Sequence, residues 1–186
     1  MNFSKLTKYT IAVLLVTDWS FSTVYFFWKF QLKNIQSFLP EEMAGNINYF
    51  NEDEFSKSAE NYYAKMVQNK NQYVVFSFID SDCPCSKFTE KHIIELKNKY
   101  GKNNIQFISV YKNKNEFFDK VPASPSVAVM DKSGRAVYFG PFSDQAACGS
   151  TAGFIEPVIE NMIRGSESRQ MNLLANGCFC RRERRI

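Results

Sequence analysis

Four of the five cysteines in this 186-residue chain form two Cys-x-Cys motifs. Cys83-Pro84-Cys85 lies near the middle of the chain, and Cys178 and Cys180 lie near its end. Thiolates attack disulfide bonds and also bind soft metal ions such as Cu(I) and Zn(II). An odd number of cysteines separated by long loops is not typical of a disulfide-dense miniature scaffold. The cysteines therefore indicate a local redox or metal site.

The Cys83-Pro84-Cys85 motif is predicted to begin a helix. Unpaired N–H groups at a helix N-terminus lower the pKa of a thiol, and proline suits the first helical position. We expect Cys83 to be exposed to solvent at the N-terminus of the helix and to act as the nucleophile. We expect Cys85 to lie inside the first turn and to act as the resolving thiol. A Cys83–Cys85 disulfide would close a small, strained ring, which favours an oxidising or isomerising role. Nearby Asp80 and Asp82 oppose thiolate formation by charge repulsion. The alternative is two buried thiols that never pair.

The other candidate ligands and nucleophiles leave several roles open. Cys148 lies in a long loop and is either a further redox partner or a structural cysteine. Cys178 and Cys180 could pass electrons to the first pair, form their own disulfide or bind metal. His92, the one histidine of the chain, is predicted to face solvent on a helix.

Residues 10–28 form an apolar run with one charge, Asp18, and with lysines on both sides. At about 1.5 Å per residue such a helix spans a hydrocarbon core of about 30 Å. Asp18 opposes insertion by roughly 2.5–3.5 kcal/mol, which the Phe, Leu and Val residues offset. Small residues typical of a signal-peptide cleavage site do not follow the run. We therefore predict an uncleaved anchor with residues 1–9 in the cytoplasm.

The rest of the sequence alternates between helical and strand patterns. Helices are predicted over 53–69, 86–100, 115–120 and 151–164, and strands over 72–79, 104–111, 126–130 and 135–139. The β-α-β-α order followed by a β-hairpin and a helix is typical of an α/β domain with a mixed sheet.

This order, with a cysteine motif at the first strand–helix junction, resembles the thioredoxin-like family. The proline of Ser124-Pro125-Ser126 stands at the start of the third strand, where that family has a cis-proline. The resemblance implies a central mixed sheet flanked by helices, here preceded by one transmembrane helix. It also implies that Pro125 lies against the cysteine pair and that Ser124 presents its backbone to a substrate peptide. The sequence departs from the family pattern in the shorter Cys-x-Cys spacing, the missing tryptophan before it and Ser77 in place of a buried carboxylate.

The predicted organisation is a cytoplasmic N-terminus (1–9), an anchor (10–28), a linker (29–52), a thioredoxin-like domain with an extra N-terminal helix (53–165) and a basic Cys-x-Cys tail (166–186). The resemblance implies a thiol–disulfide oxidoreductase on a bacterial inner membrane, facing the periplasm and acting on protein thiols or a redox partner protein. The catalytic residues would be Cys83, Cys85 and Pro125, and the substrate-binding residues Pro84 and Ser124. The possible secondary redox residues are Cys148, Cys178 and Cys180.

Two other functions remain open. One is a Cu(I) or Zn(II) metallochaperone in which Cys83, Cys85, Cys178 and Cys180 form a four-thiolate site. The other is a thioredoxin-like interaction module without turnover. The oxidoreductase reading requires no cofactor beyond the cysteines. Residues 41–164 carry 14 basic and 16 acidic side chains, which argues against a nucleic-acid surface.

Overall fold

The computed structural model describes residues 5–29, 35–39, 50–67, 71–112, 115–143, 153–166 and 169–182. The chain forms two compact units, Met1–Ile35 and Gln36–Ile186. The first unit contains the helix α1 (Lys5–Phe27), and the second contains the mixed α/β domain.

Helix α1 has the properties of a membrane-spanning helix. Its segment Thr7–Phe27 is long and apolar enough to cross a bilayer, and none of it is buried by the protein. The hydroxyls of Thr17, Ser20 and Thr23 donate to backbone carbonyls one turn earlier, at 2.7 to 3.0 Å. Internal bonds of this kind suit polar groups to an environment without water. Residues 10–27 of the predicted anchor lie within this helix.

The domain is built on a five-stranded mixed sheet with the order β3-β2-β5-β6-β7. The strands are β2 (Tyr73–Ile79), β3 (Ile105–Tyr111), β5 (Ser126–Met130), β6 (Ala136–Gly140) and β7 (Gln170–Met171). Strand β2 runs parallel to β3 and antiparallel to β5, and β5 and β6 form a hairpin. Gly134 in the hairpin turn has a φ of 83°, and a Cβ there would lie 2.7 Å from the Tyr63 ring. This turn therefore favours glycine for two reasons: the positive φ strains other residues, and a side chain would clash with the Tyr63 ring.

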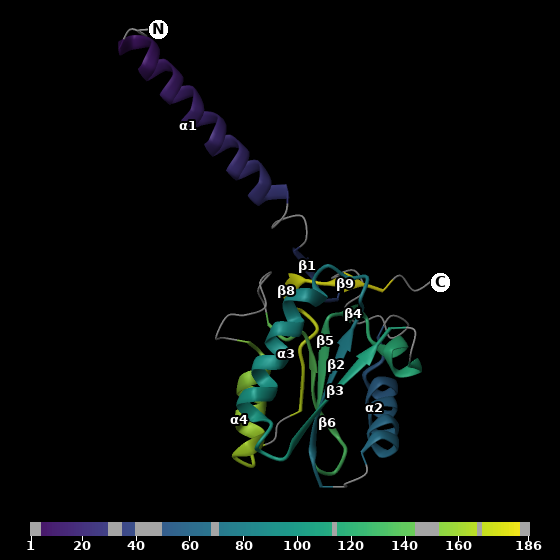
Figure 1. Ribbon diagram of the computed structural model, residues 1–186. Coiled ribbons are helices and arrows are strands. Elements are labelled where there is room, and N and C mark those ends of the chain that lie inside the picture. The colour runs from purple at the N-terminus through teal and green to yellow at the C-terminus, as the bar shows by residue number, and fades with distance from the viewer. Residues whose placement is uncertain are drawn as a thin grey trace. The chain divides into compact units, whose positions relative to one another are not determined.

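Helices cover both faces of the sheet, as Figure 1 shows. Helix α2 (Glu52–Met66) lies on one face, and α3 (Ser86–Tyr100) and α4 (Ile155–Ile163) lie on the other. The alternation of side chains along β2 explains the arrangement. Phe76 and Phe78 pack with Phe55 of α2, whereas Val75 packs with Leu96 of α3 and Ile159 of α4. Strand β2, which leads to the Cys83-Pro84-Cys85 motif, is thus packed on both of its faces.

Short elements gather at the end of the sheet where the cysteines lie. The η3 helix (Glu116–Lys120) leads to β4 (Ala123–Ser124), which pairs with β9 (Cys180–Arg181). Strand β1 (Ile35–Ser37) pairs with β8 (Asn176–Cys178). Residues treated from sequence as a tail after 165 therefore supply β7, β8 and β9. Parts of the expected linker over 29–52 also belong to the core, since Phe38, Leu39 and Phe50 are buried.

Candidate functional site

The first Cys-x-Cys motif lies in the turn that joins β2 to α3. The amide of Cys83 donates to the carbonyl of Asp80 at 3.1 Å, and the Ser86 hydroxyl donates to the same carbonyl at 2.6 Å. Cys85 is the N-cap of α3, with no capping bond from its side chain, and Pro84 precedes that cap. The motif therefore lies just before the helix. Because the first helical residue is Ser86, Pro84 stands two positions before the first helical position that was expected for it, and Cys85 caps the helix instead of lying in its first turn.

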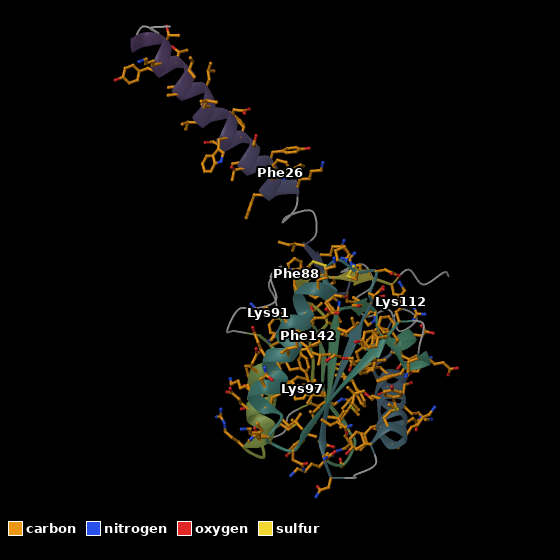
Figure 2. The ribbon with its side chains drawn as sticks, in the orientation of Figure 1. Phe26, Phe88, Lys91, Lys97, Lys112 and Phe142 are labelled. Atoms are coloured by element: carbon orange, nitrogen blue, oxygen red, sulfur yellow. A yellow bond between two sulfur atoms is a disulfide. The ribbon has the colours of Figure 1, made fainter. Side chains whose placement is uncertain are left out.

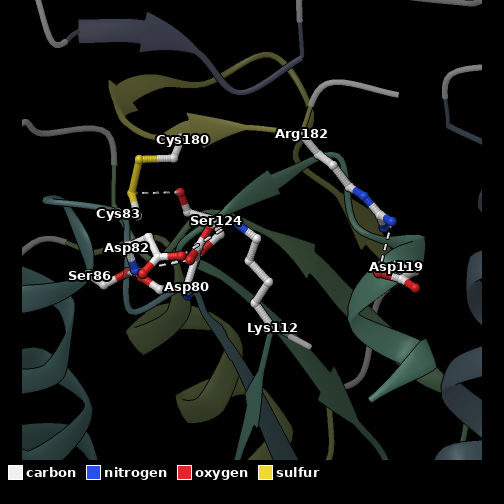
Figure 3. Close-up of polar contacts among 9 residues, drawn as sticks. All are labelled: Asp80, Asp82, Cys83, Ser86, Lys112, Asp119, Ser124, Cys180 and Arg182. Atoms are coloured by element: carbon white, nitrogen blue, oxygen red, sulfur yellow. Dashed lines mark hydrogen bonds and ion pairs between the residues drawn. A yellow bond between two sulfur atoms is a disulfide. The ribbon is translucent and has the colours of Figure 1, made fainter. Parts of the chain in front are cut away.

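Strand β4 and Pro125 lie directly beside this turn. The Ser124–Pro125 peptide bond is cis, as the family resemblance implied. Sγ of Cys83 lies 3.6 Å from the carbonyl oxygen of Ser124, and the Ser124 hydroxyl accepts a hydrogen bond from the amide of Asp80 at 3.0 Å. Figure 3 shows Ser124 next to Cys83 and close to Asp80. The structure thus brings Cys83, Ser124 and Pro125 together.

The four cysteines of the two motifs form two disulfides that cross-link the motifs. Cys83 is bonded to Cys180 with a Cα–Cα distance of 5.8 Å, and Cys85 is bonded to Cys178 with a Cα–Cα distance of 5.5 Å. We call the Cys83–Cys180 bond the outer disulfide and the Cys85–Cys178 bond the inner disulfide. The expected Cys83–Cys85 bond is therefore wrong for this state of the protein. The two motifs have equal spacing, so antiparallel placement brings both pairs of Cα atoms to the separation that disulfides prefer, without closing a small ring.

The sulfur atoms differ in their access to solvent. Cys83, Cys85 and Cys178 are buried, at 2%, 5% and 9% exposure, and Cys180 is half-buried. The expectation of an exposed Cys83 is corrected accordingly, because the tail covers that residue. Since an attacking thiolate must reach sulfur, the accessible side of the outer disulfide is Cys180.

The tail is held by more than the disulfides. The Phe179 ring is buried against Phe38, with ring centroids 5.2 Å apart. The amide of Arg182 donates to the carbonyl of Pro122 at 2.9 Å, and its guanidinium lies 2.8 Å from a carboxylate oxygen of Asp119. Sequence reasoning missed these anchors, since nothing near Cys178 and Cys180 indicates which strand they meet.

A charge pair lies under the cysteines, with a buried aspartate and an exposed lysine. The Asp80 side chain is 12% exposed and that of Lys112 is 41% exposed, and Nζ of Lys112 lies 2.7 Å from Oδ2 of Asp80 and 3.9 Å from Oδ2 of Asp82. The hydrogen bond to Asp80 raises the pKa of Lys112 above its usual value, so this side chain is a cation at neutral pH. Figure 2 shows Lys112 at the end of the domain that carries the disulfides. Lys112 therefore offsets the repulsion that Asp80 and Asp82 were expected to exert on a thiolate.

An open cavity of about 310 Å³ lies beside this pair. Asp80, Lys112, Ser124 and Cys180 contribute to its wall, together with Phe118 and Arg182. The half-buried Cys180 is thus reached from a cavity with polar walls, which gives an external thiolate a route to the outer disulfide.

The same sulfur atoms are close enough to share a metal ion after reduction. Sγ atoms of Cys83, Cys85 and Cys180 all lie within 4.8 Å of one another, and Cys178 is joined to Cys85. Thiolates rather than disulfide sulfurs are the ligands that Zn(II) and Cu(I) take. The oxidised state therefore offers no thiolate from these four residues, and the reduced state offers four.

Two further sequence expectations concern Cys148 and His92. Cys148 lies outside the described residues. His92 is buried rather than solvent-facing, and its Nε2 lies 2.7 Å from Oε1 of Glu156 on α4. The prediction for His92 was wrong because helix α4, whose position the sequence does not reveal, covers that face of α3.

The family model described as "Domain of unknown function (DUF6436)" matches residues 51–182. No curated protein matches the chain. Among solved structures, an uncharacterized conserved protein from Geobacillus kaustophilus is similar at 15% identity and a TM-score of 0.46, over 60% of this chain and 76% of that one. A hypothetical protein from Sinorhizobium meliloti 1021 is similar at 12% identity and a TM-score of 0.46, over 60% of this chain and 79% of that one.

Proposed function

We propose a function for this chain, which belongs to the DUF6436 family: it is a membrane-tethered thiol–disulfide oxidoreductase that acts on protein cysteines. The observation that carries the proposal is the joining of two Cys-x-Cys motifs by two disulfides at the start of α3. The domain would be thioredoxin-like, with Cys83 and Cys85 as its catalytic cysteines. Pro84 and the cis-proline Pro125 would shape the site, and Ser124 would contact the substrate backbone.

The chemistry begins at the outer disulfide. A substrate thiolate attacks Sγ of Cys180, a new sulfur–sulfur bond forms, and the bond to Cys83 breaks. Cys83 leaves as a thiolate at the N-terminal end of α3, where backbone N–H groups favour negative charge. A second substrate thiolate then attacks the mixed disulfide, so that the substrate is oxidised to a disulfide and Cys180 is released. Release of Cys180 frees this end of the tail, after which the buried inner disulfide can undergo the same two-electron exchange.

The proposed location is a bacterial inner membrane with the domain in the periplasm. Helix α1 supplies an apolar segment long enough to act as the anchor. Disulfides persist in oxidising compartments such as the periplasm and are rare in the cytosol. Cysteine accessibility to a membrane-impermeant thiol reagent in whole cells, after reduction, tests this orientation. Labelling only after cell lysis would contradict it.

The test of the proposed activity uses the full chain in detergent micelles. The rates of insulin reduction by dithiothreitol and of scrambled-ribonuclease refolding are measured for the wild type, Cys83→Ser and Cys83→Ser/Cys85→Ser, with Lys57→Ser on the surface of α2 as a control. We expect the double variant, which can form neither disulfide, to fall to the uncatalysed rate, Cys83→Ser to lose the activity of the outer disulfide, and the control to match the wild type. Wild-type rates in the double variant would refute the proposal.

A second candidate function, binding of Cu(I) or Zn(II), is favoured by the clustering of the cysteine Sγ atoms within 4.8 Å. Four thiolates after reduction would provide a tetrahedral zinc site. Titration of the reduced chain with Cu(I), followed by thiolate charge-transfer absorption, tests it. A saturable signal that is lost in Cys178→Ser/Cys180→Ser would support this function, and no binding at micromolar concentrations would exclude it.

A further inference from the structure

Strand β4 offers a backbone edge that the tail of the same chain occupies. Ala123 and Ser124 lie outside the five-stranded sheet, and they pair with Arg181 and Cys180 of β9 in antiparallel register. The edge lies immediately before the cis-proline Pro125 and beside Sγ of Cys83. An extended peptide is thus already seen at this edge, and it is covalently bonded to both cysteines of the first motif.

The contacts of the tail are those that any extended peptide can make. Pairing with β4 and the hydrogen bond from the Arg182 amide to Pro122 use only backbone atoms. Recognition by strand addition works in this way, with main-chain bonds for affinity and alternate side chains for specificity. Phe179 is the side chain that enters the core, where it packs on Phe38. A basic residue follows the cysteines and reaches Asp119.

Each of these contacts defines a requirement for an occupant. The two disulfides require cysteines separated by one residue, because Cys178 and Cys180 meet Cys85 and Cys83. The buried position between them requires a large apolar side chain. The carboxylate of Asp119 favours positive charge two residues after the second cysteine.

We propose that residues 177–182 are an internal occupant of a peptide-binding edge. Once thiols of an electron-donating protein have reduced both disulfides and have themselves been oxidised to disulfides, this edge accepts an extended segment of a partner protein with the pattern Cys-aromatic-Cys followed by basic residues. The proposal rests on the proposed oxidoreductase function, for which it names the substrate class. In the step at this edge, the Cys83 thiolate attacks a cysteine sulfur that the partner holds in a disulfide. The partner's sulfur–sulfur bond breaks, its second sulfur leaves as a thiolate, and the partner becomes bonded to Cys83.

The tail and a partner segment would compete for one edge. Because the tail belongs to the same chain, its effective concentration at β4 is high, and a partner gains access only after the disulfides open. Exchange with an external peptide therefore measures recognition directly.

The experiment traps a synthetic peptide in the full chain in detergent micelles. The protein carries Cys148→Ser, Cys178→Ser and Cys180→Ser, so that Cys83 and Cys85 are its remaining thiols. The probe is Gly-Cys-Phe-Cys-Arg-Arg, which copies residues 177–182, with both cysteines activated as 2-thiopyridyl disulfides. Each protein thiolate that attacks a peptide sulfur releases one thiopyridone, which is followed by absorbance, and mass spectrometry identifies the doubly linked adduct.

Two matched peptides separate recognition from thiol reactivity. One has serine in place of phenylalanine, and we expect it to react at least about tenfold more slowly, because an apolar anchor is lost. The other carries an N-methyl group on its last arginine, which removes the amide that meets Pro122. We expect a loss of about fivefold, the typical effect of one hydrogen bond. The further protein variant Phe179→Ser should accelerate trapping, since the competing tail loses its anchor.

A second measurement uses the wild-type chain and does not depend on the folding of the variants. The reduced peptide is equilibrated anaerobically with the oxidised protein, and the fraction with peptide in place of the tail is measured after acid quenching. A larger fraction for the phenylalanine peptide than for both matched peptides supports the proposal. Equal rates and equal fractions for all three peptides would overturn it. The oxidoreductase proposal is judged separately, because insulin reduction by the wild type does not depend on this peptide.

Discussion

The outer and inner disulfides connect the same two short segments, and this predicts a strongly non-additive effect on stability. Their cysteines are separated by 97 and 93 residues. In the chain-entropy model, closing a loop of about 100 residues stabilises the folded state by about 4.7 kcal/mol. When one bond already holds the motifs together, the other closes a ring of only about six residues, which the same model values at about 2 kcal/mol. Removing either disulfide alone should therefore cost about 2 kcal/mol, and removing both should cost about 7 kcal/mol.

The assay is urea unfolding of the oxidised full chain in detergent, followed by near-ultraviolet circular dichroism of tyrosine. Both tryptophans of the chain, Trp19 and Trp28, lie in the first unit and do not report on the domain. The variants replace the two cysteines of the outer disulfide, those of the inner disulfide, or all four by serine. Every variant carries Cys148→Ser, which prevents exchange with the fifth cysteine.

The reasoning fails if each single removal costs as much as half of the double removal. Such additivity would mean that the two bonds close independent loops. That result contradicts the observed pairing, in which the loop closed by Cys85 and Cys178 lies within the loop closed by Cys83 and Cys180. Peptide mapping of the unreduced wild type provides a direct control, since proteolysis must release fragments that join residues 83–85 to residues 178–180. Fragments with Cys83 bonded to Cys85 would contradict the pairing itself.

Three other predictions concern the charge pair, the hairpin and the anchor. Lys112→Met should lower the free energy of unfolding by about 1 kcal/mol, because it removes a solvent-exposed cation from the buried Asp80 carboxylate, which keeps its hydrogen bond from the Asp82 amide, and Asp80→Asn in the same chain should restore part of that loss in a double-mutant cycle. Burial raises the pKa of Asp131, but hydrogen bonds from the hairpin turn outweigh it and hold that pKa below its usual value. Its contribution is therefore present above the unfolded pKa of about 3.8 and lost as the pH falls through the lower folded pKa, so Asp131→Asn should flatten the acid limb of a stability–pH profile. Replacing Leu14 and Leu15 by arginine adds about 5–7 kcal/mol to the insertion of α1, and alkaline extraction should then release the protein from membranes that retain the wild type.

Local patterns were sufficient to predict most of the elements that form the sheet and its helices. The predicted helix over 86–100 has the bounds of α3, and the predicted strand over 126–130 has those of β5. These segments have clear periodicity, and their ends carry strong signals, such as the proline before β5. The cis-proline was predicted by resemblance, because its distance from the cysteine motif matches the family.

The cysteine pairing could not be predicted in the same way. Which sulfur meets Cys83 depends on the placement of a strand 97 residues away, and two-residue strands such as β4 and β9 have no periodicity to detect. The equal spacing of the two motifs was the one available signal, since antiparallel segments with the same spacing can form two bonds at once. Burial of His92 depends in the same way on α4, and the partner of Asp80 depends on the end of β3.

The separation between the bonded cysteines also sets the order of events during synthesis. Cys83 and Cys85 are made 93 or more residues before their partners, a delay of roughly 5–20 s at the usual elongation rates. During that interval β2, α3, β3, β5 and β6 are all complete, whereas β8 and β9 are not. In the proposed periplasmic location, the two early cysteines would meet oxidants before their final partners are made, and the bond within reach would be the one between themselves. We therefore expect maturation to include a late exchange in which the arriving Cys178 and Cys180 replace any earlier pairing, so that the yield of folded protein depends on disulfide isomerisation.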